Sequence, residues 1–168
     1  MDRCAYVALL AAFHGFIAPW EAALARALPS TLHEAFEARR KSAWLEADLH
    51  VLGASLGTRR AAVPVPDSLP GQIGAWYVVE GSTLGGRIIA PALAAHFGFA
   101  PRQGNAYFDA YGADTGSRWR SFRMLAEAEV GPSDIEACVA GARLTFEALD
   151  AWFAACGIDA ACCAGAET

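Results

Sequence analysis

Three glycines stand in a stretch that otherwise reads as one long helix. Gly81, Gly85 and Gly86 lie between the apolar runs 75–79 and 88–97. Each glycine in a helix interior costs roughly 1 kcal/mol relative to alanine. Gly81 and Gly85 share a helix face, and Gly86 lies one step around it. A face without side chains lets a partner helix or a planar ligand approach the backbone, and the spacing alone leaves both interpretations open.

Two other kinds of site find no support in the sequence. A phosphate-binding loop would need a strand before the glycines and a Gly-Lys-Ser/Thr word after them, and neither occurs. A di-iron site in a helix bundle would use Glu-x-x-His words, and the chain has none. The acidic residues of the helices are therefore expected to form structural ion pairs with a basic run. They are Glu21, Glu46, Asp48 and Glu80, and the basic run is Arg39, Arg40 and Lys41.

The elements that must position these residues are predicted to be helices. Apolar residues recur at three- and four-residue steps, with no sustained alternation of strand length and no internal repeat. The expected helices cover about 4–28, 31–52, 72–96, 117–129 and 132–156. The sequence therefore predicts an all-α, single-domain helical bundle.

The ends of these helices carry recognisable signals. Pro19 is expected to distort the first helix. Capping words open the second helix at Thr31 and the last at Ser133. Gly53 is expected to end the second helix. The proline-rich stretch 63–71 is predicted to exclude helix and to form a surface connection.

Composition limits the class of protein. The chain has 168 residues, of which 55% are hydrophobic, enough for one core and too short for two. We expect one domain over 1–168 with a loose tail from about residue 157. The net charge of -5 argues against a nucleic-acid partner. Charges or prolines interrupt each apolar run before the roughly 20 residues that span a bilayer, and no signal peptide is recognised, so we expect no membrane association and a cytoplasmic location.

The five cysteines make a poor disulfide framework, because their number is odd and their spacing irregular. Cys4, Cys138 and Cys156 stand among apolar helical residues and are expected in the core. Cys162 and Cys163 are adjacent in the tail. This pair suits either a metal or redox site or a functionally silent C-terminus.

Several longer sequence motifs stand out along the chain. They are 75–86 (AWYVVEGSTLGG), 107–108 with 111–112, 115–122 (TGSRWRSF), 13–16 (FHGF) followed by 19–21 (PWE), and 45–49 (LEADL). Together these motifs resemble the heme oxygenases that bacteria often encode beside bacteriophytochromes. The resemblance runs from about Tyr6 to about Phe153, which is nearly the whole chain.

This resemblance implies a single helical domain that holds heme between a helix with an axial histidine and the kinked, glycine-rich helix. The implied reaction is oxidative cleavage of heme to biliverdin, iron and carbon monoxide, for iron release or for supply of phytochrome chromophore. Heme is then both substrate and cofactor, and a ferredoxin- or flavodoxin-type reductant is the external electron donor. The iron supplies the difficult chemistry, while the protein supplies orientation and a proton-bearing water. A bacteriophytochrome is an implied recipient of the product, and the protein is expected to be a monomer.

The axial ligand is where this chain departs from the pattern. The family's axial histidine lies on a helix ahead of the position matched by Tyr6, and the chain starts at Met1, so we expect that helix to be missing from this sequence. A start set too far downstream, a truncation and a real loss of the ligand are the alternatives. A real loss would leave a non-catalytic tetrapyrrole-binding or partner-binding module.

Another histidine is a possible replacement for the axial ligand. His14 lies on the apolar face of the first helix, and a neutral imidazole can bind iron. The other interpretation of His14 is a buried histidine bonded to a backbone carbonyl. The remaining histidines, His33, His50 and His96, are expected to be exposed.

The resemblance also assigns roles around the heme. Gly81, Gly85 and Gly86 would let the helix backbone sit close over the macrocycle. Many heme oxygenases outside the phytochrome-linked group have an aspartate where this chain has Ser82. A hydroxyl can hold a water but does not ionise near neutral pH, so water positioning is expected. The alternative for Ser82 is a hydrogen bond back to its own helix.

The two heme propionates call for basic residues at the pocket mouth. Arg120 matches the family's basic segment and is the first choice, with Arg123 the second, because arginine makes paired hydrogen bonds to carboxylate. Without the resemblance, these arginines would read as a solvated helix surface. The tyrosines expected at the pocket edge are Tyr77, Tyr107 and Tyr111, although aromatic residues on helices also serve as core.

Overall fold

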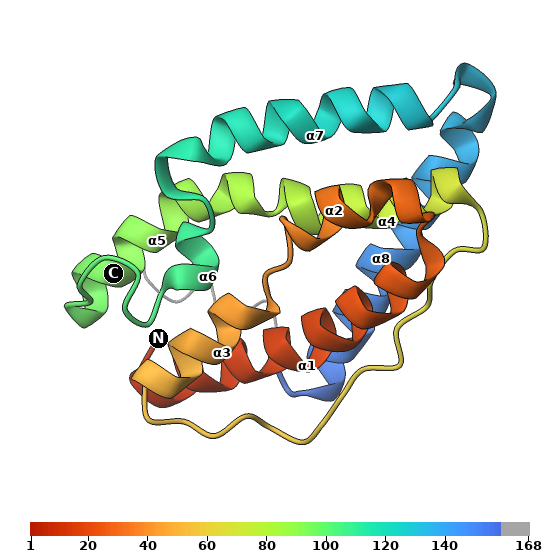
Figure 1. Ribbon diagram of the computed structural model, residues 1–168. Helices are drawn as coiled ribbons and strands as arrows, with labels where there is room; N and C mark the ends of the chain where they lie inside the picture. The colour runs from red at the N-terminus through yellow and green to blue at the C-terminus, as the bar shows by residue number, and fades with distance from the viewer. Residues whose placement is uncertain (159–168) are drawn as a thin grey trace, which may run out of the picture.

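The computed structural model describes residues 1–158, and that part of the chain is helical with no strand (Figure 1). The α-helices are α1 (Arg3–Ala27), α2 (Ser30–Glu37), α3 (Ser42–Val51), α4 (Leu69–Gly81), α5 (Thr83–Phe97), α6 (Ala106–Asp109), α7 (Thr115–Glu129) and α8 (Ile135–Ala155). Short 3-10 turns at Gly112–Asp114 and Pro132–Asp134 precede α7 and α8. The predicted all-α fold is confirmed. Cys162 and Cys163, with most of the tail expected from residue 157, lie outside the described residues.

Helix α4 lies at the centre of the bundle. Figure 1 shows α7 running along one side of α4, α1 and α3 on the other side, and α8 crossing behind. The α4 side chain Trp76 sits between Phe36 of α2 and Phe122 of α7, with ring centroids 5.1 Å from each. All three rings are almost completely buried. This aromatic packing fixes α4 between the two layers.

Helices α4 and α8 touch through their backbones. A Cβ added at Gly74 would lie 1.8 Å from the carbonyl oxygen of Cys138, and one added at Gly141 would lie 2.0 Å from the carbonyl oxygen of Gly71. Any side chain at these positions would push the helices apart. Glycines 74 and 141 therefore serve close helix packing.

The long helix expected over 72–96 is interrupted at Ser82, which separates α4 from α5. The Gly85 N–H donates to the Ser82 carbonyl at 3.2 Å, a tighter 3-10 type of bond. The helix also begins earlier than expected, at Leu69, with the Ser68 hydroxyl accepting from the Gly71 N–H. Pro70 stands in the first turn, where its missing N–H costs nothing, so the expectation that helix is excluded up to residue 71 was wrong.

Three other expectations need correction. The helix expected over 31–52 is two helices, α2 and α3, joined by residues 38–41. Neither Thr31 nor Ser133 caps a helix: Pro29 and Asp134 occupy the N-cap positions of α2 and α8, without side-chain capping bonds. The described cysteines are not in the core, because Cys4 is exposed and the other two are half-buried. The prediction of burial rested on the apolar residues next to these cysteines in the sequence, which do not fix how far a side chain is exposed.

Two buried carboxylates bond to the first residues of helices that lie far from them in the sequence. Glu21 of α1 accepts from the Ser42 hydroxyl at 2.6 Å and from the backbone N–H groups of Lys41 and Ser42 at the start of α3. Asp48 of α3 accepts from the N–H groups of Ala106 and Tyr107, each at 2.8 Å, at the start of α6. Each carboxylate satisfies N–H groups that a helix cannot bond internally.

Helix α1 is long and apolar enough to cross a membrane by length and composition, so the sequence expectation that no run qualifies was wrong on this measure. Half of its most apolar window is buried within the bundle. Its residues Leu10, Phe16, Trp20 and Leu24 lie in the core. A core helix of a globular domain gives the same signal.

Candidate functional site

An apolar cavity of about 270 Å³ opens beside the end of α4. Aromatic and aliphatic side chains from α1, α4, α6 and α8 surround it. Its lining residues are Phe13, Phe16, Ile17, Tyr77, Val78, Val79, Gly81, Ser82, Tyr107, Phe146 and Leu149. The volume is close to the lower end of the range of small-molecule sites, roughly 300–1,000 Å³. The cavity is therefore large enough for only part of a larger apolar ligand.

Two aromatic rings mark that mouth. Tyr77 is 45% exposed and Phe146 is 60% exposed, although both are large side chains that line the cavity. Tyr77 packs against Trp119 of α7, with ring centroids 4.9 Å apart. Flat apolar groups exposed at the edge of a cavity suit a flat, apolar ligand that would cover them.

The glycines of the predicted site separate into three environments. Gly81 lines the cavity, and a Cβ added there would meet Trp119 only at an ordinary contact distance of 3.4 Å. Gly85 faces open space, with its nearest neighbour at 4.0 Å. Gly86 lies against α6, where an added Cβ would come within 1.9 Å of the Phe108 carbonyl oxygen. The close-packing interpretation therefore holds for Gly86, and ligand approach at Gly81 stays a prediction.

Ser82 lines the cavity beside Gly81. Its hydroxyl donates to the Val79 carbonyl oxygen at 2.8 Å, the bond back to its own helix that the sequence left open. The hydroxyl oxygen keeps its acceptor capacity for a donor in the cavity. Water positioning by Ser82 stays a prediction, limited now to accepting a hydrogen bond.

The two predicted arginines lie in different surroundings on α7. Arg123 is exposed and pairs with Glu127 at 3.1 Å. Arg120 is exposed and makes no ion pair or side-chain hydrogen bond within residues 1–158. Arg120 directly follows Trp119, which packs against Gly81 and Tyr77. Of the two arginines predicted to bind carboxylate, Arg120 is thus the one without a carboxylate partner in the described part of the chain.

None of the described residues that line the cavity is a histidine. His14 is almost completely buried, and its Nε2 lies 3.2 Å from the Glu46 Oε1 while its Nδ1 has no partner. The bond to Glu46 replaces the backbone carbonyl that the sequence suggested. The free Nδ1 could still bind a metal while Nε2 keeps its bond to Glu46, but His14 does not line the cavity. His33, His50 and His96 are exposed, as expected.

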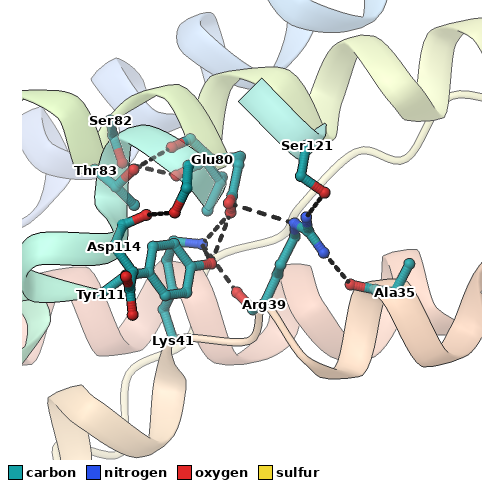
Figure 2. A network of polar contacts seen from close by, with 11 residues as sticks. Ala35, Arg39, Lys41, Glu80, Ser82, Thr83, Tyr111, Asp114 and Ser121 are labelled. Carbon is teal, nitrogen blue, oxygen red and sulfur yellow. Dashed lines mark hydrogen bonds and ion pairs between the residues drawn. The ribbon is translucent and has the colours of Figure 1, made fainter. Parts of the chain in front are cut away.

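A buried ionic network lies on the other side of the α4 end (Figure 2). The Glu80 Oε2 accepts from the Lys41 Nζ at 2.7 Å and from the Tyr111 hydroxyl at 3.0 Å. The Arg39 Nε lies 3.5 Å from the Glu80 Oε1. Lys41 also donates to the Arg39 carbonyl oxygen at 2.9 Å. This network joins α4, the α2–α3 connection and the segment after α6, and Tyr111 belongs to it rather than to the cavity lining.

Burial controls the ionisation of this network. It lowers the pKa of the Lys41 ammonium below its ordinary value, and the adjacent Glu80 carboxylate opposes that shift. Burial also raises the pKa of Tyr111, and Glu80 raises it further, so the hydroxyl remains a donor. Sequence reasoning placed these charges in structural pairs but did not connect Glu80 to Tyr111. A lone acidic residue in an apolar helix, with the basic run 39–41 elsewhere, was the available signal.

Comparisons with known proteins show the family of the sequence. A family model described as heme oxygenase matches residues 1–155. A protein of Xanthomonas campestris pv. campestris (strain 8004) named heme oxygenase is 33% identical over 150 residues, which cover 87% of this chain and 87% of that protein. The matched region includes every residue that lines the cavity and every member of the ionic network.

Proposed function

Because this chain belongs to the heme oxygenase family, we propose that it cleaves heme oxidatively to biliverdin, iron and carbon monoxide. Heme is its substrate and its cofactor, and supplies the oxygen chemistry when bound. The observation that carries the proposal is the apolar cavity whose wall includes the bare backbone of Gly81. A flat macrocycle suits this combination of an apolar wall, exposed aromatic rim and close backbone.

The described residues that line the cavity would hold heme by apolar contact. Phe13, Phe16 and Leu149 supply apolar contact inside the cavity, and Tyr77 and Phe146 supply it at the mouth. Burial of these surfaces excludes water from the reacting edge. Gly81 leaves the α4 backbone bare at the cavity wall, beside Trp119. Orientation of the substrate is thus a property of the α4 end.

Ser82 holds a proton-bearing water at the same wall. The Ser82 O–H donates a hydrogen bond to the Val79 carbonyl oxygen, so the hydroxyl oxygen is left to accept a hydrogen bond from the water. The hydroxyl does not ionise near neutral pH, and the water therefore supplies the proton. Gly85 extends the open backbone beyond Ser82, and Gly86 anchors this segment to α6.

Arg120 binds a heme propionate. It is exposed, free of ion pairs within the described residues, and adjacent to the Trp119 that packs against the cavity wall. Arginine forms paired, charge-assisted hydrogen bonds with a carboxylate. Arg123 is the second basic residue of this helix and gives up Glu127 to serve the same role.

The wider assignments follow from the bacteriophytochrome-associated type of heme oxygenase that the sequence resembles. The electron donor is a ferredoxin- or flavodoxin-type protein, and a bacteriophytochrome is a recipient of the biliverdin. The protein acts as a monomer in the cytoplasm.

The test is heme titration of the 168-residue chain, followed by absorption spectra as a reductant is added in air. The proposal expects a sharp Soret band that saturates at one heme per chain and then gives way to biliverdin bands. Stoichiometric binding without biliverdin would support a tetrapyrrole-binding module instead. Absence of stoichiometric binding by the 168-residue chain would contradict the assignment for this chain.

Two variants and a matched control locate the site. Gly81→Ala places a methyl group at the cavity wall and is expected to weaken heme binding about tenfold, equivalent to about 1.4 kcal/mol. Gly57→Ala makes the same change in a loop with nothing within 4 Å and should leave binding unchanged. His14→Ala should leave the Soret band unaltered, because His14 does not line the cavity.

A further inference from the structure

We propose that Glu80 is a positioning residue of the heme site, which fixes the α4–α5 break against the cavity through Lys41, Arg39 and Tyr111. The inference rests on the proposed function for its heme-dependent part. The buried ionic network thereby has a role in catalysis. Neither the cavity lining nor the glycine-rich motif of the family indicates that role.

Glu80 stands at the point where the two sides of α4 meet. The next two residues along the chain, Gly81 and Ser82, line the cavity, whereas the Glu80 carboxylate lies in the ionic network. The side chain of Glu80 is fully buried. A shift of this one residue therefore moves the backbone that faces the heme.

The network holds Glu80 from several segments at once. Arg39 and Lys41 come from the α2–α3 connection, and Tyr111 comes from the segment between α6 and α7 (Figure 2). The backbone of Glu80 is held as well, because the Thr83 hydroxyl donates to its carbonyl oxygen at 2.7 Å across the break. Side chain and backbone of the same residue thus fix where α4 ends and how α5 continues.

The charge balance of the network depends on Glu80. Two buried cations, Arg39 and Lys41, face its single carboxylate. If Glu80 were neutral, these cations would lose the carboxylate that bonds Lys41 directly, and the more distant Glu21 charge would be the remaining counter-charge on Lys41. The cost of a buried, poorly paired charge would then be relieved by opening the network. The break is the adjacent segment with the weakest helical bonding, so it would move first.

The first arm of the test needs no heme. Amide hydrogen exchange is measured on the whole protein for wild type, Glu80→Gln and Glu21→Gln. Glu80→Gln is expected to speed exchange of amides 81–87 about tenfold relative to the rest of α4. Glu21→Gln is the comparison variant, because Glu21 is an equally buried glutamate whose carboxylate bonds the Ser42 hydroxyl and the Lys41 backbone N–H at the start of α3. It should speed exchange at the start of α3 more than at 81–87. Unchanged or uniformly faster exchange in Glu80→Gln would overturn the proposal.

A milder variant protects the test against failure to fold. Tyr111→Phe removes the hydroxyl that bonds Glu80 and Lys41 but keeps all three charges. It should speed exchange of the same amides about threefold. No change at 81–87 in Tyr111→Phe, if Glu80→Gln is unfolded, would count against the network as the device that holds the break.

The second arm uses the heme complex. Glu80→Gln is expected to lower the single-turnover rate of biliverdin formation about tenfold while the heme Kd changes less than threefold, because contacts remain and alignment is lost. Equal losses in binding and rate would indicate a purely structural role and overturn the inference. If the wild-type chain fails to bind heme, the proposed function fails, and the exchange arm still decides whether Glu80 holds the break.

Discussion

The two sides of the α4 end differ in kind. Toward the α2–α3 connection and Tyr111, α4 presents Glu80, whose carboxylate is fully buried and joined to two cations and a hydroxyl. Toward α8 and the mouth of the cavity, it presents Tyr77 and Gly81 around an open apolar space. The closed polar side and the open apolar side belong to the same last turn of α4.

This difference indicates how the fold divides its tasks. An apolar wall binds a flat ligand over area and gives little direction, because hydrophobic contact is non-directional. Hydrogen bonds and ion pairs are directional and hold backbone in one position. We therefore infer that the polar side fixes the position of the cavity wall and that the apolar side binds the ligand.

The largest effect is expected from breaking the polar side. Lys41→Met removes the ammonium that bonds the Glu80 carboxylate at 2.7 Å. The carboxylate then keeps the Tyr111 hydroxyl at 3.0 Å and Arg39, 3.5 Å away, as its one cation. Loss of one partner of a buried pair costs about 3–5 kcal/mol of unfolding free energy. Urea unfolding measures the loss.

The control for that change is an exposed ion pair. Glu127→Gln breaks the pair with Arg123 on the surface of α7 and should cost less than about 0.5 kcal/mol. Similar losses in Lys41→Met and Glu127→Gln would show that the buried network does not hold α4.

An intermediate effect is expected at two adjacent glycines. Gly86→Ala forces a Cβ against the Phe108 carbonyl of α6 and should cost about 1–3 kcal/mol. Gly85→Ala meets open space and should stabilise the protein by up to about 1 kcal/mol, because alanine favours helix. Thermal unfolding of both variants measures the contrast.

Heme affinity gives a second test of the Gly85→Ala variant. If Gly85 serves the ligand, Gly85→Ala binds heme more weakly although it is the more stable protein. A variant that is both more stable and unchanged in heme binding would refute the role of Gly85 at the site.

The smallest effect on stability is expected on the apolar side. Phe146→Ala removes a ring that is 60% exposed at the mouth of the cavity and should change unfolding free energy by less than about 0.5 kcal/mol. Phe122→Ala is the buried counterpart and should cost about 3–5 kcal/mol. Phe146→Ala should nevertheless weaken heme binding, which titration of both variants measures. Unaltered heme affinity would place the ligand elsewhere.

Local signals predicted the helices better than their ends. Helical spacing of apolar residues indicated α1, α7 and α8 within a few residues. The capping words at Thr31 and Ser133 did not form caps, because tertiary packing placed the helix starts at neighbouring residues. Glycines four apart indicated a special segment around Ser82, but the same spacing serves Gly81 at a cavity and Gly86 against a backbone.

The sequence by itself determined an all-helical domain and the family to which it belongs, because both are expressed in residue spacing and in contiguous words such as 75–86. Only the tertiary structure decided which charges meet. Glu80, Lys41 and Tyr111 are distant along the chain, and their pairing depends on how α3, α4 and the segment after α6 pack together. The physical reason is that a hydrogen bond depends on position in space to within a few tenths of an ångström, which residue types and spacing do not specify.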